Sequence, residues 1–233
     1  MSTHLNVTFR TTLAVILGLI VLIFSGAIFQ AILTQTELMN DFPGLIKTVN
    51  HTLMLVFSIL LILAINKGKL KGYGFTWNIK FPIVKIVSIS ILLGFLPSII
   101  IMVADLSMTD SPVSDFLWLE KIIYIWLWAS ICEEVFTRGL IQGFLFPVKH
   151  IGFNFLNYFI SLPVMIGAVF FGTMHLMLLT LGMAFFTVLI IVIFGIILGT
   201  IAGYYREQTN SLVPAILVHM CFNIGGSLLG LFA

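Results

Sequence analysis

Between Phe153 and Tyr205 the chain runs for 53 residues without a single Asp, Glu, Lys or Arg. One straight helix over this stretch would be about 80 Å long at a rise of about 1.5 Å per residue. The hydrocarbon core of a bilayer is only about 30 Å thick. The stretch must therefore fold back on itself. We expect an interfacial piece up to Leu162, a span from Pro163, a break near Gly182 and a span that ends at Tyr205.

The rest of the chain has the same apolar character. Of its 233 residues 60% are hydrophobic and only 9% are charged, whereas about one quarter of the residues of a soluble domain are charged. The composition and length predict an all-α, polytopic transmembrane helix bundle of about seven spans in a lipid bilayer. Because no basic tail or lysine run with interleaved aromatic residues is present, no nucleic-acid partner is expected. The other expected spans are 13–33, 49–65, 81–104, 116–137 and 211–232.

The charged residues of the loops predict an orientation. Residues 66–80 contain four lysines, whereas residues 105–115 contain three aspartates and no basic residue. Arg138, Lys149 and Arg206 fall on the same side as the lysine-rich loop. Since Lys and Arg mark the cytoplasmic side of a membrane, we expect a plasma-membrane protein with a cytoplasmic N-terminus, an external C-terminus and a site that opens toward the cytoplasm.

Three charged residues lie close together in the fourth expected span, in the stretch ICEEVFTRGL at 131–140. An ionisable group in the bilayer costs several kcal/mol unless it is paired or hydrated, and it marks a functional site by default. Glu134 and Arg138 are four residues apart and share a helix face, so an ion pair is expected. Glu133 is rotated by about 100° from Glu134. Snorkelling at a helix end would explain Arg138, but it explains Glu133 poorly.

Imidazole and amide groups occupy two later spans. His175 lies in VFFGTMHLML, and His219 and Asn223 lie four residues apart in PAILVHMCFN. Each has a purely structural alternative: a packed histidine for His175, and hydrogen bonds between helices for the other two. His51 lies near an expected span end, and we set it aside as interfacial. If the helices of Glu133, His175 and His219 pack together, their polar faces meet in one wet cavity.

Such a cavity has the groups needed to add water to a carbonyl. A carboxylate and a histidine can hold and deprotonate water, and a second histidine and an amide can donate to an oxyanion. Alternatively, Glu133, His175 and His219 could ligate Zn²⁺ and leave one position for water. The residues alone leave open whether the cofactor is zinc or none. The chain has neither an HExxH zinc-protease motif nor a GxSxG nucleophile motif.

The same residues resemble the motifs of a known family. EEVFTRG at 133–139 matches EExxxR, FGTMH at 171–175 matches FxxxH, and HMCFN at 219–223 matches HxxxN. In this order they resemble the CPBP group of intramembrane endopeptidases, also called the CAAX-protease-like or Abi family. The resemblance covers about residues 116–226.

The resemblance implies a division of the single membrane domain. Residues 1–110 would be N-terminal transmembrane helices, and residues 111–233 would be a catalytic core with four helices around a polar site. It also implies hydrolysis of a peptide or membrane-anchored protein, either prenylated or of the bacteriocin or quorum type. The family is often labelled metalloprotease, and a metal-free glutamate mechanism is also proposed for it. The implied roles are water activation by Glu133 and His175, an oxyanion site of His219 and Asn223, and support from Glu134 and Arg138.

Two other functions fit parts of the pattern. A non-catalytic immunity or scaffold protein would bind a peptide, and changes in the motifs would not impair it. A small transporter would use Glu133 and the histidines as a proton relay, but it would favour charges spread through the depth of the membrane and internal repeats. Because the polar groups cluster and no repeat is visible, an endopeptidase is the favoured interpretation.

Overall fold

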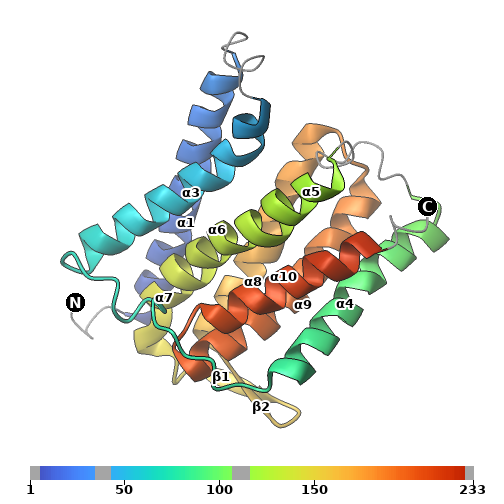
Figure 1. The fold of residues 1–233 in the computed structure, drawn as a ribbon. Coiled ribbons are helices and arrows are strands. Elements are labelled where there is room, and N and C mark those ends of the chain that lie inside the picture. The colour runs from blue at the N-terminus through green and yellow to red at the C-terminus, as the bar shows by residue number, and fades with distance from the viewer. Residues whose placement is uncertain (1–5, 35–42, 107–115, 229–233) are drawn as a thin grey trace.

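The computed structural model describes residues 6–34, 43–106 and 116–228 and shows an all-α membrane bundle (Figure 1). Within these ranges five helices are long and apolar enough to cross a bilayer. A sixth apolar helix, α10 (Val213–Ser227), is shorter. The expected transmembrane fold is therefore confirmed, and the protein is an integral membrane protein. The five long helices are α1 (Val7–Leu33), α3 (Pro43–Ile65), α4 (Ile83–Val103), α8 with its 3-10 extension (Leu162–Leu181) and α9 (Phe185–Thr209).

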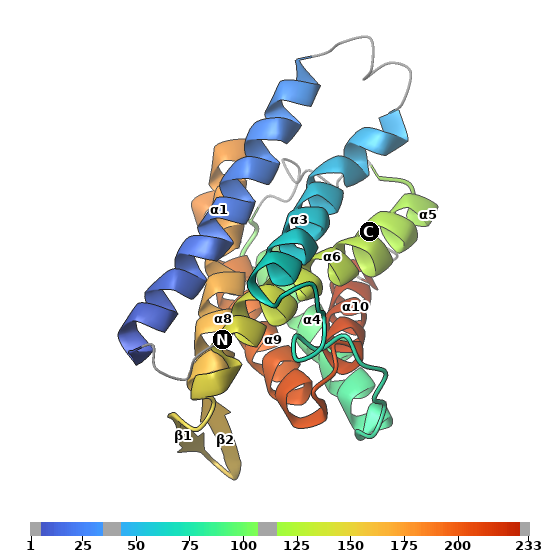
Figure 2. The same cartoon turned by 90° about the vertical axis from the view of Figure 1, so that its left-hand side faces the viewer.

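A further helical segment, residues 118–148, runs through the middle of the bundle (Figure 2). All residues from 130 to 145 except Ile131 are buried, so this segment is enclosed by the other helices. Two stretches of π-helix flank the pair Glu133 and Glu134, and such wide turns often occur at functional sites. The pieces of this central segment are α5 (Trp118–Glu120), η1 (Lys121–Ala129), α6 (Ser130–Glu134), η2 (Val135–Ile141), α7 (Gln142–Leu145) and η3 (Phe146–Val148).

The stretch before Leu162, which we expected to lie at the membrane interface, forms a β-hairpin. Strand β1 (Gly152–Phe155) pairs in antiparallel register with β2 (Tyr158–Ser161), with a two-residue turn between them. Aromatic side chains favour such pairing. The next two boundaries agree with the sequence: α8 begins at Leu162, with Pro163 in its first turn, and Gly182 ends η4 (His175–Leu181) with a left-handed φ of 94°. The last long helix continues four residues beyond the expected end at Tyr205.

The ends of several helices gather at one end of the bundle. The start of α1, the lysine-rich loop, the hairpin and the turn between α9 and α10 all lie there (Figure 1). Hydrogen bonds join the loop to the turn: Ser211 Oγ donates to the Thr76 carbonyl, and Asn78 Nδ2 donates to the Thr209 carbonyl at 2.9 Å. The lysine-rich loop thus lies at the end of the bundle where α1 begins. The orientation of the chain in the membrane stays a prediction, and most of the aspartate-containing loop lies outside the described residues.

Close packing between α4 and α10 depends on glycine. A Cβ at Gly94 would collide with the carbonyl oxygen of Phe222, and a Cβ at Gly225 would collide with that of Ile91. Small residues allow helices in a membrane to approach closely enough for tight van der Waals packing. Ser98 Oγ adds a hydrogen bond of 2.9 Å to the Gly226 carbonyl. This interface fixes α10, which carries two of the candidate site residues.

Candidate active site

Glu133 lies inside the bundle between two imidazoles from other helices. Its side chain on α6 is only 12% exposed. His51 on α3 places Nε2 3.1 Å from Glu133 Oε1, within hydrogen-bond distance. His219 on α10 places Nε2 3.9 Å from Glu133 Oε2. The carboxylate therefore contacts groups that converge from α3 and α10, and it is not paired with Arg138.

Glu134 forms the centre of a second, fully buried group of charges. Its Oε1 accepts a hydrogen bond of 2.9 Å from Arg138 Nη1, and neither side chain is exposed. This is the ion pair that the four-residue spacing predicts. The same Oε1 lies 2.9 Å from His219 Nδ1, which donates its hydrogen to the carboxylate. Glu134 thus fixes the orientation of the His219 ring and directs Nε2 toward Glu133.

Arg138 is held by more than its partner carboxylate. Nη1 also donates to the Thr137 hydroxyl at 2.6 Å, and the guanidinium lies 4.4 Å from the centre of the Phe171 ring. An arginine over an aromatic face gains a cation–π interaction that is strengthened by desolvation. The contact connects the central segment with α8. Arg138 therefore stabilises the position of Glu134 relative to α8.

His175 begins the 3-10 turns that follow α8. Its Nδ1 donates to the Phe171 carbonyl at 2.9 Å, which fixes the ring and leaves Nε2 as the free nitrogen. The rings of His175 and His219 both lie edge-on to Phe171, with centroid distances of 5.1 and 5.2 Å. The two imidazoles that the motifs indicate therefore flank one aromatic ring.

A cavity of about 120 Å³ lies beside these rings, and His175, His219 and Asn223 all line it. This volume is enough for several water molecules. Asn223 Nδ2 donates to the Ile125 carbonyl at 3.2 Å and to Ser130 Oγ at 3.1 Å, which ties α10 to the central segment. Glu133 is not among the lining residues and lies next to the cavity through its contact with His219.

His51 is the site residue that the sequence interpretation missed. The expected span began at 49, which put His51 at an interface, but α3 begins at Pro43 and the helix carries His51 into the bundle. One signal was available: Glu133 had no partner in its own helix, and an imidazole in an apolar helix is a candidate partner. The sequence does not state which helices are neighbours, so this signal could not select His51.

The predicted zinc ligands do not form a ligand set in the structure. Among the described residues, no group of three or more His, Cys, Asp or Glu side chains is arranged to hold a metal ion. His219 and His175 each use Nδ1 for a hydrogen bond, so only their Nε2 atoms could face a metal ion. Because the residues present do not fit a zinc ion in this arrangement, no step of the proposed mechanism runs through a metal.

Comparison with known proteins identifies the part of the chain that carries these motifs. Residues 115–225 match the family model described as type II CAAX prenyl endopeptidase Rce1-like. This segment is similar to the Rce1-like family. It contains every motif residue from Glu133 to Asn223, and it confirms the resemblance found in the sequence. No curated protein and no solved structure matches the chain significantly.

The Rce1-like match supports an activity only at the level of the family. The match supports a CAAX-type protease, a hydrolase that works in the membrane, and it does not specify a substrate or a mechanism. The matched residues cover a little under half of the chain, and His51 lies outside them. The contact between His51 and Glu133 therefore joins the Rce1-like segment to the N-terminal helices.

Proposed function

We propose that the protein is an intramembrane endopeptidase that hydrolyses a peptide bond of a membrane-anchored peptide or protein. The observation that carries this proposal is the position of Glu133, whose carboxylate is held between His51 and His219 beside a cavity lined by His175 and Asn223. A carboxylate in the bilayer interior is costly. A scaffold has no need of that cost, whereas hydrolysis needs a base.

In the proposed mechanism Glu133 is the general base. A water held between its carboxylate and His175 Nε2 loses a proton to Glu133 as the water oxygen attacks the carbonyl carbon of the peptide bond. The tetrahedral intermediate then collapses, the C–N bond breaks, and Glu133 returns the proton to the leaving nitrogen. Such positioned proton transfer typically contributes about 10²- to 10⁴-fold to the rate.

The other polar residues would stabilise the charge that develops on the carbonyl oxygen. His219, in its imidazolium form with hydrogen on both nitrogens, would donate from Nε2. Glu134 holds its Nδ1–H, and Arg138 holds Glu134. Asn223 would add an amide hydrogen after releasing one of its present acceptors, Ile125 or Ser130. Donors fixed in advance are effective because they need little reorganisation during the reaction.

We propose a prenylated C-terminal sequence as the substrate, since the matched family is described by that activity. The site would open toward the cytoplasmic side of the plasma membrane, as the loop charges indicate. An unprenylated bacteriocin or quorum-type peptide is the alternative substrate within the same reaction.

A pair of synthetic peptides tests the reaction and the substrate together. The purified protein in vesicles receives two peptides of identical sequence with a C-terminal CAAX tetrapeptide, one farnesylated and one unmodified. We expect release of the terminal tripeptide from the farnesylated peptide at least about tenfold faster, because the lipid brings the peptide to the membrane. Mass spectrometry identifies the products. Equal cleavage of both would move the proposal to unprenylated substrates, and cleavage of neither would favour a binding protein.

Changing His51 to phenylalanine is expected to lower kcat about 10- to 100-fold with little change in KM. The ring volume is retained, but Glu133 loses its 3.1 Å contact, and a hydrogen bond to a charged group contributes about 1.5–3 kcal/mol. His51→Gln keeps a donor and should recover part of the rate. Steady-state kinetics with the farnesylated peptide measure both constants. The exposed His150, changed to phenylalanine, is the matched control, and an unchanged kcat in His51→Phe would remove the positioning role.

A further inference from the structure

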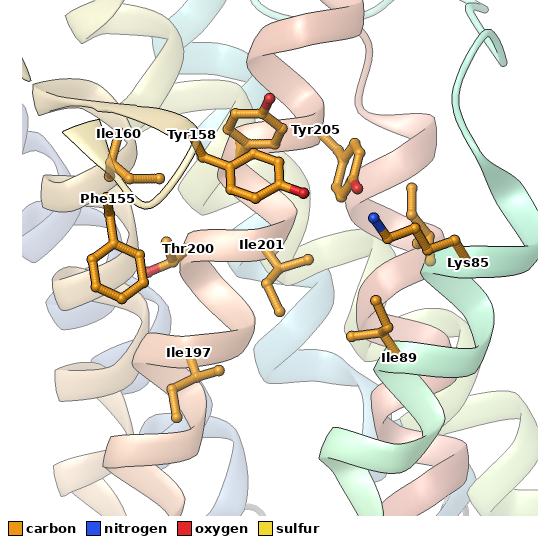
Figure 3. A pocket seen from close by; sticks show the side chains of 11 residues that line it. Lys85, Ile89, Phe155, Tyr158, Ile160, Ile197, Thr200, Ile201 and Tyr205 are labelled. Atoms are coloured by element: carbon orange, nitrogen blue, oxygen red, sulfur yellow. The ribbon is translucent and has the colours of Figure 1, made fainter. Parts of the chain in front are cut away.

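A second and larger cavity lies between α4, the hairpin and α9 (Figure 3). Its volume is about 390 Å³, which lies in the range of about 300–1,000 Å³ of small-molecule sites. It is separate from the cavity lined by His175, His219 and Asn223, which we call the catalytic cavity, and no motif residue lines it. Its walls are almost wholly apolar, with Ile86, Ile89, Phe155, Ile160, Ile197 and Ile201 among the lining residues.

The wall residues are partly exposed on the outside of the bundle. Phe155 is 60% exposed, Ile89 38% and Ile197 37%. On helices long and apolar enough to span a bilayer, as α4 and α9 are, this outer surface faces acyl chains. A hydrocarbon chain that enters the cavity gains van der Waals contacts with these side chains, which is the main source of association inside a membrane.

One end of the cavity is polar and positively charged. Figure 3 shows the Lys85 ammonium group on the same side as the hydroxyl groups of Tyr158 and Tyr205. Lys85 is exposed, and within the described part of the chain it forms no hydrogen bond or ion pair. It lies in the first turn of α4, five residues after Lys80 of the lysine-rich loop. This end of the cavity therefore lies close to the positively charged end of the bundle.

We propose that this cavity binds one anionic phospholipid, with an acyl chain between α4 and α9 and the phosphate at Lys85. An apolar cavity that opens to the bilayer and ends at an unpaired cation has the two features that such a lipid requires. Basic pockets between transmembrane helices bind anionic head groups in this manner. The hydroxyl groups of Tyr158 and Tyr205 would donate hydrogen bonds to the phosphate oxygens.

The lipid site would adjoin the catalytic cavity without being part of it. Both cavities lie between α4 and α9, with Pro97 and Leu198 lining the catalytic cavity and Ile89 and Ile201 lining the outer one. The alternative occupant of the outer cavity is the hydrophobic anchor of a substrate that enters between these two helices. Competition with a farnesylated peptide distinguishes that anchor from a bound lipid.

The acyl-chain part of the proposal is tested with a variant that fills the cavity. The protein is purified from vesicles of equal phosphatidylcholine and phosphatidylglycerol, and native mass spectrometry counts the retained lipids. We expect the wild type to retain one phosphatidylglycerol and Ile197→Trp to retain about tenfold less. Ile193 lies one turn earlier on α9, is 47% exposed and does not line the cavity, so Ile193→Trp should behave as wild type. Equal retention in wild type and Ile197→Trp would overturn the proposal.

The head-group part is tested at Lys85. We expect Lys85→Gln to lower the ratio of retained phosphatidylglycerol to phosphatidylcholine about fivefold, since this is the effect of one cation near a membrane surface. Lys80→Gln, outside the cavity lining, is the control and should keep the wild-type ratio. An unchanged ratio in Lys85→Gln would remove the phosphate contact. Excess farnesylated peptide should leave the lipid bound, and displacement of the lipid would assign the cavity to the substrate anchor instead.

Discussion

Replacing Glu133 with glutamine is expected to abolish peptide hydrolysis while the protein stays folded. The amide has the same shape as the carboxylate and can still accept a hydrogen bond from His51, but it cannot take a proton from water. The expected loss in kcat is about 10²- to 10⁴-fold, the usual contribution of a general base. The rate of tripeptide release from the farnesylated peptide measures this loss, and the thermal unfolding midpoint checks the fold.

Glu120 provides a matched control in the same central segment. Glu120 lies near the N-terminal end of that segment, where its Oε1 pairs with Lys47 Nζ at 2.6 Å. Its side chain is 24% exposed. Glu120→Gln should retain full activity because this carboxylate lies 13 residues before Glu133 and does not line the catalytic cavity. A Glu133→Gln protein that hydrolyses at the wild-type rate would show that Glu133 is not the base. The binding-protein and transporter interpretations would then regain support.

Local spacing in the sequence predicted the features of the site that arise within one helix. Glu134 and Arg138 pair because residues four apart share a face. Gly182 ends a helical segment because glycine tolerates the left-handed backbone required there. The separation of Glu133 from Arg138 followed from the same helix geometry, and it correctly indicated that Glu133 needs a partner from elsewhere.

Contacts between helices could not be predicted in this way. His51 and Glu133 are 82 positions apart, and no spacing rule relates α3 to the central segment. The second donor to Glu134, His219, was likewise hidden, because the sequence indicates that His219 is polar but not which carboxylate it meets. The hairpin at 152–161 was missed for a different reason. Its aromatic residues are as apolar as those of a span, so composition alone did not separate a strand from a membrane segment.

Replacing Arg138 with methionine is expected to cause the largest loss of stability of any single change at the site. Methionine fills much of the space but leaves the Glu134 carboxylate buried with His219 as its remaining partner. Removing one member of a buried pair typically costs about 3–5 kcal/mol in the free energy of unfolding, because the other charge stays uncompensated. Denaturant-induced unfolding in micelles measures the loss. Lys47→Met, which breaks the partly exposed pair with Glu120, should shift the transition far less.

The double variant Glu134→Gln with Arg138→Met separates stability from function. It leaves no unpaired charge at these two positions, so most of the lost unfolding free energy should return. Arg138 Nε and Nη2 have no hydrogen-bond partner within the described residues, which means that the native pair itself is incompletely compensated. Activity should not return, because the double variant lacks the carboxylate that orients His219. Recovery of both stability and hydrolysis would show that this buried pair serves the fold alone.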